Sequence, residues 1–186
     1  MTKFMAMFFK GIKIKIDAQA KIFTYKDLRD VPEKKGIYIM FENGQVDKDG
    51  RNRVVRIGKA DNLHDRLLNH FEGKKGESIF RKHVQSALNT NNKEEISKYI
   101  QENISYALVC VPKLLSTEDL EATLTLMLAG YSKDLDVGNW LGLNSKNKTI
   151  QNYKIWNTQN CKNTTKAEIG LNDYLLDLFE IGLIKK

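Results

Sequence analysis

A short stretch of the chain combines side chains that can act together on a phosphate group. Tyr38 ends the tripeptide Gly36-Ile37-Tyr38, the run Arg56-Ile57-Gly58-Lys59 adds two cations, and Arg66 and His70 follow four residues apart. An arginine can donate two parallel hydrogen bonds to a phosphate, and a tyrosine and a histidine can help to move a proton. This combination of residue types favours chemistry on a phosphodiester.

The residues around Tyr38 and Arg56 predict two strands joined as a hairpin. Residues 36–41 and 54–57 are short apolar runs rich in amino acids that favour strands. The pairs Asn43-Gly44 and Asp49-Gly50 lie between them and are typical of turns. We therefore expect a hairpin with a polar, extended connection.

Arg66 and His70 belong to a predicted helix that follows the second strand. Asp61 or Asn62 can cap its N-terminus, and an apolar stripe recurs at four-residue spacing: Leu63, Leu67 and Phe71. Successive helical residues rotate by about 100°, so Arg66 and His70 project beside this stripe and near the sheet. The predicted elements therefore direct these polar side chains toward one surface.

Glu121 is the acidic residue best placed to hold a metal ion. Ser116 begins a capping box for a helix through Ala129, and Glu121 falls at the margin of its apolar face, about 20° from Leu128. A carboxylate in such a place is costly unless a cation pairs with it. Magnesium or manganese suits this hard oxygen ligand, and a salt bridge with Arg66 or a lysine is the alternative without chemistry.

Composition and charge limit the class of protein. The chain has 186 residues, a net charge of +7 and a pI near 9.3, which favours polyanionic partners. Cys110 and Cys161 lie far apart with no Cys/His cluster, so neither a zinc site nor a disulfide framework is indicated, and a reducing cytoplasm is expected. The apolar start at residues 4–9 is followed by lysines and no cleavage site, and no apolar run approaches the roughly 18 residues of a spanning helix.

The ordered set of motifs resembles the GIY-YIG nuclease superfamily. The resemblance covers roughly Lys35 to Gly142 and rests on strand, strand, arginine helix, strand and glutamate helix in that order. It implies a metal-dependent endonuclease that hydrolyses DNA, most simply double-stranded DNA. The segments 78–83 and 139–142 also look like one bacterial branch of the superfamily.

The pattern and the resemblance together predict an α+β fold. A small mixed or antiparallel three-stranded sheet flanked by helices would occupy residues 35–143, after an N-terminal extension of strands and a short helix over residues 1–34. A polar arm and an amphipathic helix would occupy residues 144–186. The remaining predicted elements are helices at 78–88 and 93–102, a strand at 104–111, a loop or arm at 144–165 and a helix at 171–184.

The resemblance also implies roles for individual residues. Glu121 would hold one magnesium or manganese ion, Arg66 would stabilise developing charge, and Tyr38 would take part in generating the attacking water. His70 would orient Tyr38 or accept a proton, and a purely structural histidine is the alternative. The stabilising asparagine of the family is assigned to Asn139, with Asn144 as the other candidate.

Arg56 is the main departure from the family, because it stands where the second motif usually has tyrosine. An arginine stays protonated, so it cannot act as a base. Any base role passes to Tyr38, His70 or metal-bound water, and Arg56 would instead bind phosphate beside Lys59. The alternative is an inactive copy that keeps the scaffold and binds DNA or RNA.

Substrate contact is expected to extend over two basic segments, which contain Lys74, Lys75, Arg81, Lys82, Lys146, Lys148 and Lys154. Tyr153 and Trp156 would stack on bases or, more simply, anchor the polar arm. One compact site cuts one strand at a time, so double-strand cleavage would require a homodimer, for which the last helix is a candidate interface. A protein that binds acidic partners through charge alone is a third reading.

Overall fold

The structure is a computed structural model that describes residues 21–46, 50, 52–74, 78–110 and 116–161. Most of the predicted N-terminal strands, all of the predicted helix at 171–184, and Lys75 lie outside these residues. Among the described residues, no helix has the length and apolar character needed to cross a membrane.

The strands form an antiparallel sheet in the described part of the chain. It contains β1 (Gly36–Val46), β2 (Asn52–Ala60) and β3 (Ile104–Cys110) in the order β2-β1-β3, so β1 is central and β2 lies at one edge. The predicted α+β class is therefore confirmed, with the sheet antiparallel throughout. Both predicted hairpin strands are longer than the apolar runs that signalled them.

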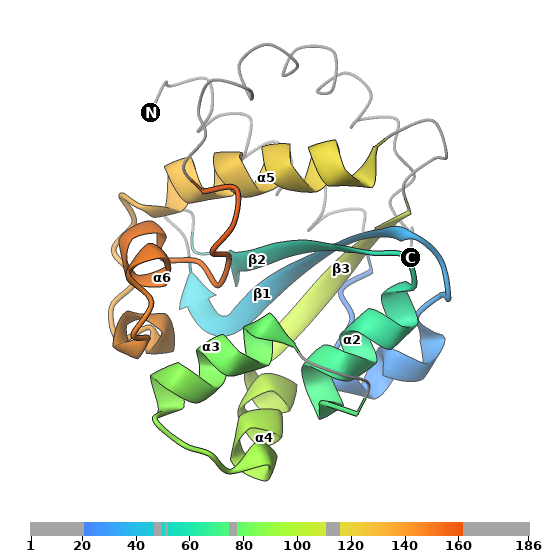
Figure 1. Ribbon diagram of the computed structural model, residues 1–186, viewed down its shortest axis with the longest axis horizontal. Coiled ribbons are helices and arrows are strands. Elements are labelled where there is room, and N and C mark those ends of the chain that lie inside the picture. The colour runs from blue at the N-terminus through green and yellow to red at the C-terminus, as the bar shows by residue number, and fades with distance from the viewer. Residues whose placement is uncertain (1–20, 47–49, 51, 75–77, 111–115, 162–186) are drawn as a thin grey trace.

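The helices cover both faces of this sheet. Figure 1 shows α5 on one face and α2, α3 and α4 on the other. Short helices complete the described part at its two ends. The bounds are η1 (Tyr25–Asp30), α2 (Leu63–Glu72), α3 (Ile79–Leu88), α4 (Lys93–Asn103), α5 (Thr117–Ser132), η2 (Leu141–Asn144) and α6 (Lys148–Tyr153).

The predicted helix starts are confirmed by their caps. The Asn62 side chain accepts a hydrogen bond from the Asp65 backbone N–H at 3.0 Å, and the Ser116 hydroxyl accepts one from Asp119 at 3.2 Å. Each cap satisfies a backbone donor that has no partner inside the helix. The two helices that carry Arg66, His70 and Glu121 therefore begin where the sequence predicts.

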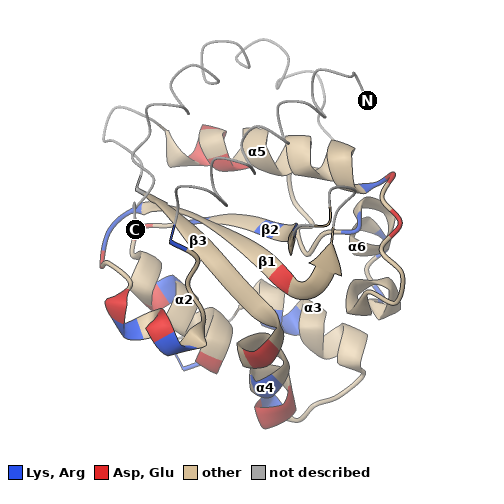
Figure 2. Ribbon diagram, turned by 180° about the vertical axis from the view of Figure 1, so that it is seen from behind, with Lys and Arg blue, Asp and Glu red and all other residues tan. Residues whose placement is uncertain are grey.

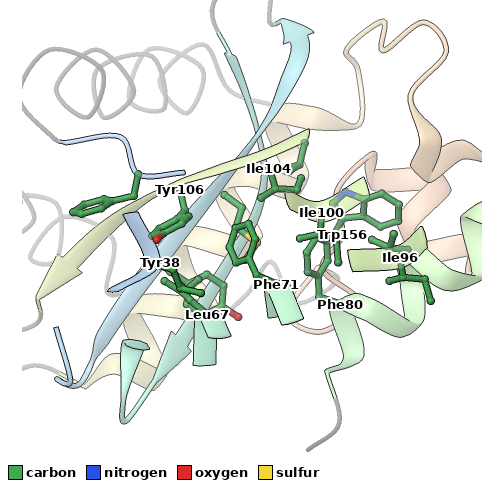
Figure 3. Packing of buried hydrophobic residues seen from close by; sticks show 14 of the residues in the cluster. Tyr38, Leu67, Phe71, Phe80, Ile96, Ile100, Ile104, Tyr106 and Trp156 are labelled. Carbon is green, nitrogen blue, oxygen red and sulfur yellow. The ribbon is translucent and has the colours of Figure 1, made fainter. Parts of the chain in front are cut away.

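Alternation along β1 divides the core into two layers. Ile37, Ile39 and Phe41 pack toward α5, while Tyr38 and Met40 pack toward α2, α3 and α4. Figure 3 shows the second layer, in which the predicted stripe of α2 meets aromatic residues of the sheet and of α3. Because β1 is covered on both faces, its apolar run is nearly continuous.

A buried carboxylate ties the C-terminal part of the described chain to the sheet. Glu42, at 4% exposure, accepts hydrogen bonds from the Tyr99 hydroxyl, from Trp140 Nε1 at 2.8 Å and from Trp156 Nε1 at 3.1 Å. Arg53 stacks on the Trp140 ring and donates to the Lys154 carbonyl. The two indoles thus fix residues 140–156 against β1 and β2.

The prediction of a loop or arm over residues 144–165 is wrong for part of this region. Residues 148–153 form α6, and Ile150, Ile155 and Trp156 are completely buried. Asn147 caps α6 by accepting from the Thr149 backbone N–H at 2.9 Å. The asparagine-rich segment whose composition indicated a loop therefore contains a helix cap and several buried apolar residues. Trp156 is a packing residue rather than a surface for bases.

Candidate active site at the edge of β2

Most of the residues predicted to do chemistry lie around one pocket. It has a volume of about 160 Å³ and lies where the edge strand β2 meets the start of α3, the start of α5 and residues 157–159. Its lining residues are Tyr38, Arg56, Gly58, Lys59, Arg66, Ile79, Glu121, Asn157, Thr158 and Gln159.

The strand register explains how both faces of the sheet contribute to the pocket. Tyr38 pairs with Gly58 and Met40 pairs with Arg56, so Tyr38 and Arg56 lie on the face covered by α2 and α3. Lys59 pairs with Ile37 and therefore lies on the α5 face, where it contacts Glu118. The pocket thus spans the edge of β2 and receives side chains from both layers.

Gly58 is required by the position of Tyr38. A Cβ atom built on Gly58 would lie 2.2 Å from the Tyr38 hydroxyl oxygen and 2.3 Å from Cζ, both far below contact distance. The end of the tyrosine ring therefore lies directly over the glycine and brings the hydroxyl to the edge of β2. The glycine of the second motif and the tyrosine of the first act as one unit.

A hydrogen-bonded chain holds Tyr38 from behind. The Tyr38 hydroxyl lies 2.7 Å from His70 Nε2, and His70 Nδ1 lies 2.7 Å from Ser78 Oγ. His70 is completely buried, and its burial, followed by the charges of Arg56, Arg66 and Arg81, lowers its pKa well below the ordinary value. The ring is therefore neutral at neutral pH and reaches the pocket only through Tyr38.

Glu121 lies in the first turns of α5 and is partly buried, as its position beside the apolar face predicts. Burial raises the pKa of this carboxyl, while Arg56, Lys59 and a hydrogen bond from Asn160 Nδ2 at 3.1 Å act in the opposite direction. Within the described residues no ion pair joins Glu121 to Arg66, so the alternative of a simple salt bridge is not observed.

The three cations of the pocket have different surroundings. Arg56 is 8% exposed and donates from Nη1 to the Trp156 carbonyl at 3.0 Å, whereas Lys59 is exposed and pairs with Glu118. Arg66 is partly buried; its Nε, like that of Arg56, has no hydrogen-bond partner among the described residues, but within these residues Arg66 lacks a bond like the one from Arg56 to Trp156. Arg66 is therefore the cation with the most unused donor capacity.

Asn157 is a pocket residue that the sequence analysis missed. Its Oδ1 accepts from the Ile57 backbone N–H at 3.1 Å and its Nδ2 donates to the Ile57 carbonyl at 2.7 Å. Together with the bond from the Trp156 N–H to the Val55 carbonyl at 2.7 Å, this pairing continues the ladder along the edge of β2. Asn139 and Asn144 are exposed and do not line the pocket.

The predicted nucleic-acid contacts divide into two groups. Arg81 donates to the carbonyls of His70, Phe71 and Lys93, and Lys154 donates to the Leu135 carbonyl, so both side chains serve the fold. The other described members are exposed: Lys74, Lys82, Lys146 and Lys148. Figure 2 shows acidic and basic residues side by side on α2 and α4 rather than a face of one sign.

The donor set of the pocket limits the kind of metal ion that fits. In the described part of the chain, no group of three or more His, Cys, Asp or Glu side chains could hold a metal. Glu121 offers one carboxylate, and Thr158 and Gln159, whose side chains carry oxygen atoms, line the same pocket. Magnesium commonly binds through one or two carboxylates while keeping water and substrate phosphate as its other ligands. The residues present fit such an ion.

Comparison with protein families identifies the class of the chain. Residues 3–110 match a family described as the GIY-YIG domain, and the chain belongs to this family. The match contains Tyr38, Arg56, Lys59, Arg66 and His70, whereas Glu121 and Asn157 lie beyond its last residue. No curated protein and no solved structure matches the chain. The resemblance in sequence is therefore confirmed, and it indicates a nuclease-type function acting on nucleic acid.

Proposed function

We propose that this protein is a metal-dependent endonuclease of the GIY-YIG type that hydrolyses phosphodiester bonds in DNA. The observation that carries the proposal is the pocket at the edge of β2, where a tyrosine, three cations and a single carboxylate from β1, β2, α2 and α5 line the same space. Phosphodiester hydrolysis needs a positioned nucleophile, charge stabilisation on the phosphate and help for the leaving oxygen. The pocket offers side chains suited to the first two requirements.

Tyr38 orients the attacking water in this mechanism. A neutral imidazole accepts at one nitrogen and donates at the other, and the mechanism requires the tautomer in which Nε2 accepts the Tyr38 O–H while Nδ1 donates to Ser78 Oγ. The phenol oxygen then keeps a lone pair that can accept a hydrogen bond from a water bound in the pocket that Tyr38 lines. His70 fixes this direction and is a positioning residue, since it is buried and both its nitrogens are hydrogen-bonded.

Arg66 and Lys59 act on the phosphate itself. The planar guanidinium of Arg66 can donate two hydrogen bonds to the phosphate oxygens as negative charge builds up on them. Lys59 supplies a point charge and exchanges its partner Glu118 for the substrate. Arg56, held by the Trp156 carbonyl, contributes a fixed positive charge in place of the usual tyrosine.

Glu121 is the proposed ligand of a magnesium or manganese ion. When bound, such an ion polarises the phosphate and stabilises the leaving oxygen. Glu121 must be ionised for this role, and Arg56, Lys59 and the Asn160 amide all favour the ionised form. Asn157 holds one wall of the pocket against β2 through the two hydrogen bonds between its side chain and the Ile57 backbone.

Nucleic-acid binding without catalysis is the second candidate function. It is favoured by Arg56, which cannot act as a base and donates one hydrogen bond to the Trp156 carbonyl. The protein would then bind nucleic acid through the exposed lysines without cutting it. Salt-dependent binding with no turnover in any divalent metal would favour this alternative.

Incubation of supercoiled plasmid with the protein tests the proposal. We expect nicked or linear DNA in magnesium or manganese, none in EDTA, and none with Glu121→Ala. Asp119→Ala is the matched control, because Asp119 is an exposed acid two residues earlier in α5. Metal-dependent cleavage that survives Glu121→Ala contradicts the mechanism. Linear product formed before the nicked pool builds up would support a homodimer.

A further inference from the structure

Ile79 is an exposed aliphatic side chain in a pocket that is otherwise polar. It is 48% exposed, and with Val46 and Leu143 it belongs to the exposed large hydrophobic residues of the described chain. Of these three, only Ile79 lines the pocket at the edge of β2. The other lining residues are charged or polar side chains and Gly58, so this isoleucine contributes nothing to binding a phosphate.

The backbone of Ile79 is held by the same residues that hold Tyr38. Ser78 caps α3 by accepting from the Arg81 N–H at 3.2 Å, and the same hydroxyl lies 2.7 Å from His70 Nδ1. Phe80 is completely buried between His70 and Trp156, with ring centroids 5.6 Å and 6.0 Å away. The first residue of α3 is therefore fixed in place with its side chain exposed at the pocket.

An exposed aliphatic group at such a site gains free energy only if an apolar surface covers it. A phosphodiester in the pocket brings a nucleotide on each side of the reacting phosphate, and the bases present flat apolar faces of the right kind. We infer that Ile79 packs against the base of a nucleotide adjoining the scissile phosphate, an inference that rests on the proposed function. Ile79 is then a substrate-binding residue that seats this nucleotide beside Tyr38.

The size of the effect follows from the area removed from water. Alanine removes most of the aliphatic area that the base would cover, which corresponds to about a tenfold fall in kcat/KM. The loss should disappear when the base is absent, because the remaining sugar and phosphate do not cover the side chain.

The experiment uses a short duplex whose cut position has been mapped with the wild-type protein. Two further duplexes carry one abasic nucleotide, placed before or after the cut. The variants are Ile79→Ala and Leu143→Ala, a matched exposed aliphatic residue outside the pocket. We expect Ile79→Ala to lose about tenfold on the intact duplex and less than about twofold on one abasic duplex. Leu143→Ala should match the wild type on all three.

Several results would overturn the inference. If Ile79→Ala and the wild type have equal kcat/KM on the intact duplex, Ile79 makes no contact that matters for cleavage. If the tenfold loss persists on both abasic duplexes, the substitution acts on the protein structure and not through a base. If the wild type binds but cuts nothing, the nuclease proposal fails on its own. In that case the base contact is tested by the dissociation constant for the duplex, measured by fluorescence anisotropy. Equal dissociation constants for Ile79→Ala and Leu143→Ala overturn the base contact. Absence of binding to any nucleic acid overturns both proposals.

Discussion

Glu42 and Glu121 are both carboxylates set among apolar side chains, but the protein meets their charges in different ways. Glu42 is almost completely buried and receives hydrogen bonds from Tyr99, Trp140 and Trp156. Glu121 is partly exposed at a pocket and receives one from Asn160 among the described residues. A buried carboxylate whose hydrogen-bonding capacity is filled within the fold contributes to stability. A carboxylate with unfilled capacity beside cations can instead bind a ligand.

The neighbouring arginines repeat this contrast. Arg53 is buried beside Glu42, and burial lowers its pKa to about 10 against the opposing effect of that carboxylate. Its guanidinium stacks on Trp140 and cannot reach the pocket residues without leaving the core. Arg56, three residues later in β2, lines the pocket. The same strand therefore supplies one arginine to structure and one to the site.

Removal of Glu42 should give the largest effect on stability. Glu42→Ala leaves two indole N–H groups and a tyrosine hydroxyl without their buried acceptor, and leaves Arg53 without the nearby negative charge, so we expect a loss of about 3 to 5 kcal/mol in the free energy of unfolding. Glu121→Ala removes a carboxylate that burial already disfavours, and should cost less than about 1 kcal/mol. Urea denaturation of both variants measures the difference, and equal losses would remove the distinction between the two carboxylates.

A change at Arg66 tests whether the pocket acts on a phosphate. Arg66→Lys keeps the positive charge but loses the paired donors, so we expect kcat to fall by about 100-fold with little change in stability. Arg29→Lys is the control, because Arg29 is an exposed arginine on η1 outside the pocket. Steady-state cleavage of a labelled duplex gives the rates, and full activity of Arg66→Lys would contradict the assigned role.

The smallest effect concerns pH. Cleavage needs ionised Glu121, so activity should fall as the pH drops through a pKa that burial raises above the ordinary 4.5. Lys59 favours the ionised form, so Lys59→Gln should move this acid limb to higher pH, by less than about one unit because the lysine is exposed and screened. The pH dependence of kcat/KM reports the shift. If the acid limb of Lys59→Gln does not move, Lys59 does not influence the ionisation of Glu121.

Local patterns predicted much of the fold and part of the site. The stripe of α2, its Asn62 cap and the position of Glu121 on α5 follow from periodicity and short-range hydrogen bonds, and the structure agrees with each. Asn157 was missed because its place depends on a pairing with Ile57 between distant parts of the chain. No local signal marks an asparagine that completes a strand edge.

Charge counting had a similar limit. Arg81 and Lys154 belong to basic segments in sequence, yet both donate to backbone carbonyls. Long cationic side chains can satisfy helix ends and turns as readily as they bind a partner, and composition alone does not separate these uses. The exposed lysines that remain are fewer than the sequence indicated.

Exchange of each carboxylate for its neutral amide tests the central claim most directly. Glu121→Gln and Glu42→Gln are compared for plasmid nicking in magnesium or manganese and for urea denaturation, both at a temperature where each variant is folded. We expect Glu121→Gln to keep wild-type stability and lose at least about 1,000-fold in nicking rate, and Glu42→Gln to lose stability while still nicking. Nicking by Glu121→Gln at the wild-type rate would contradict the assignment of the active site.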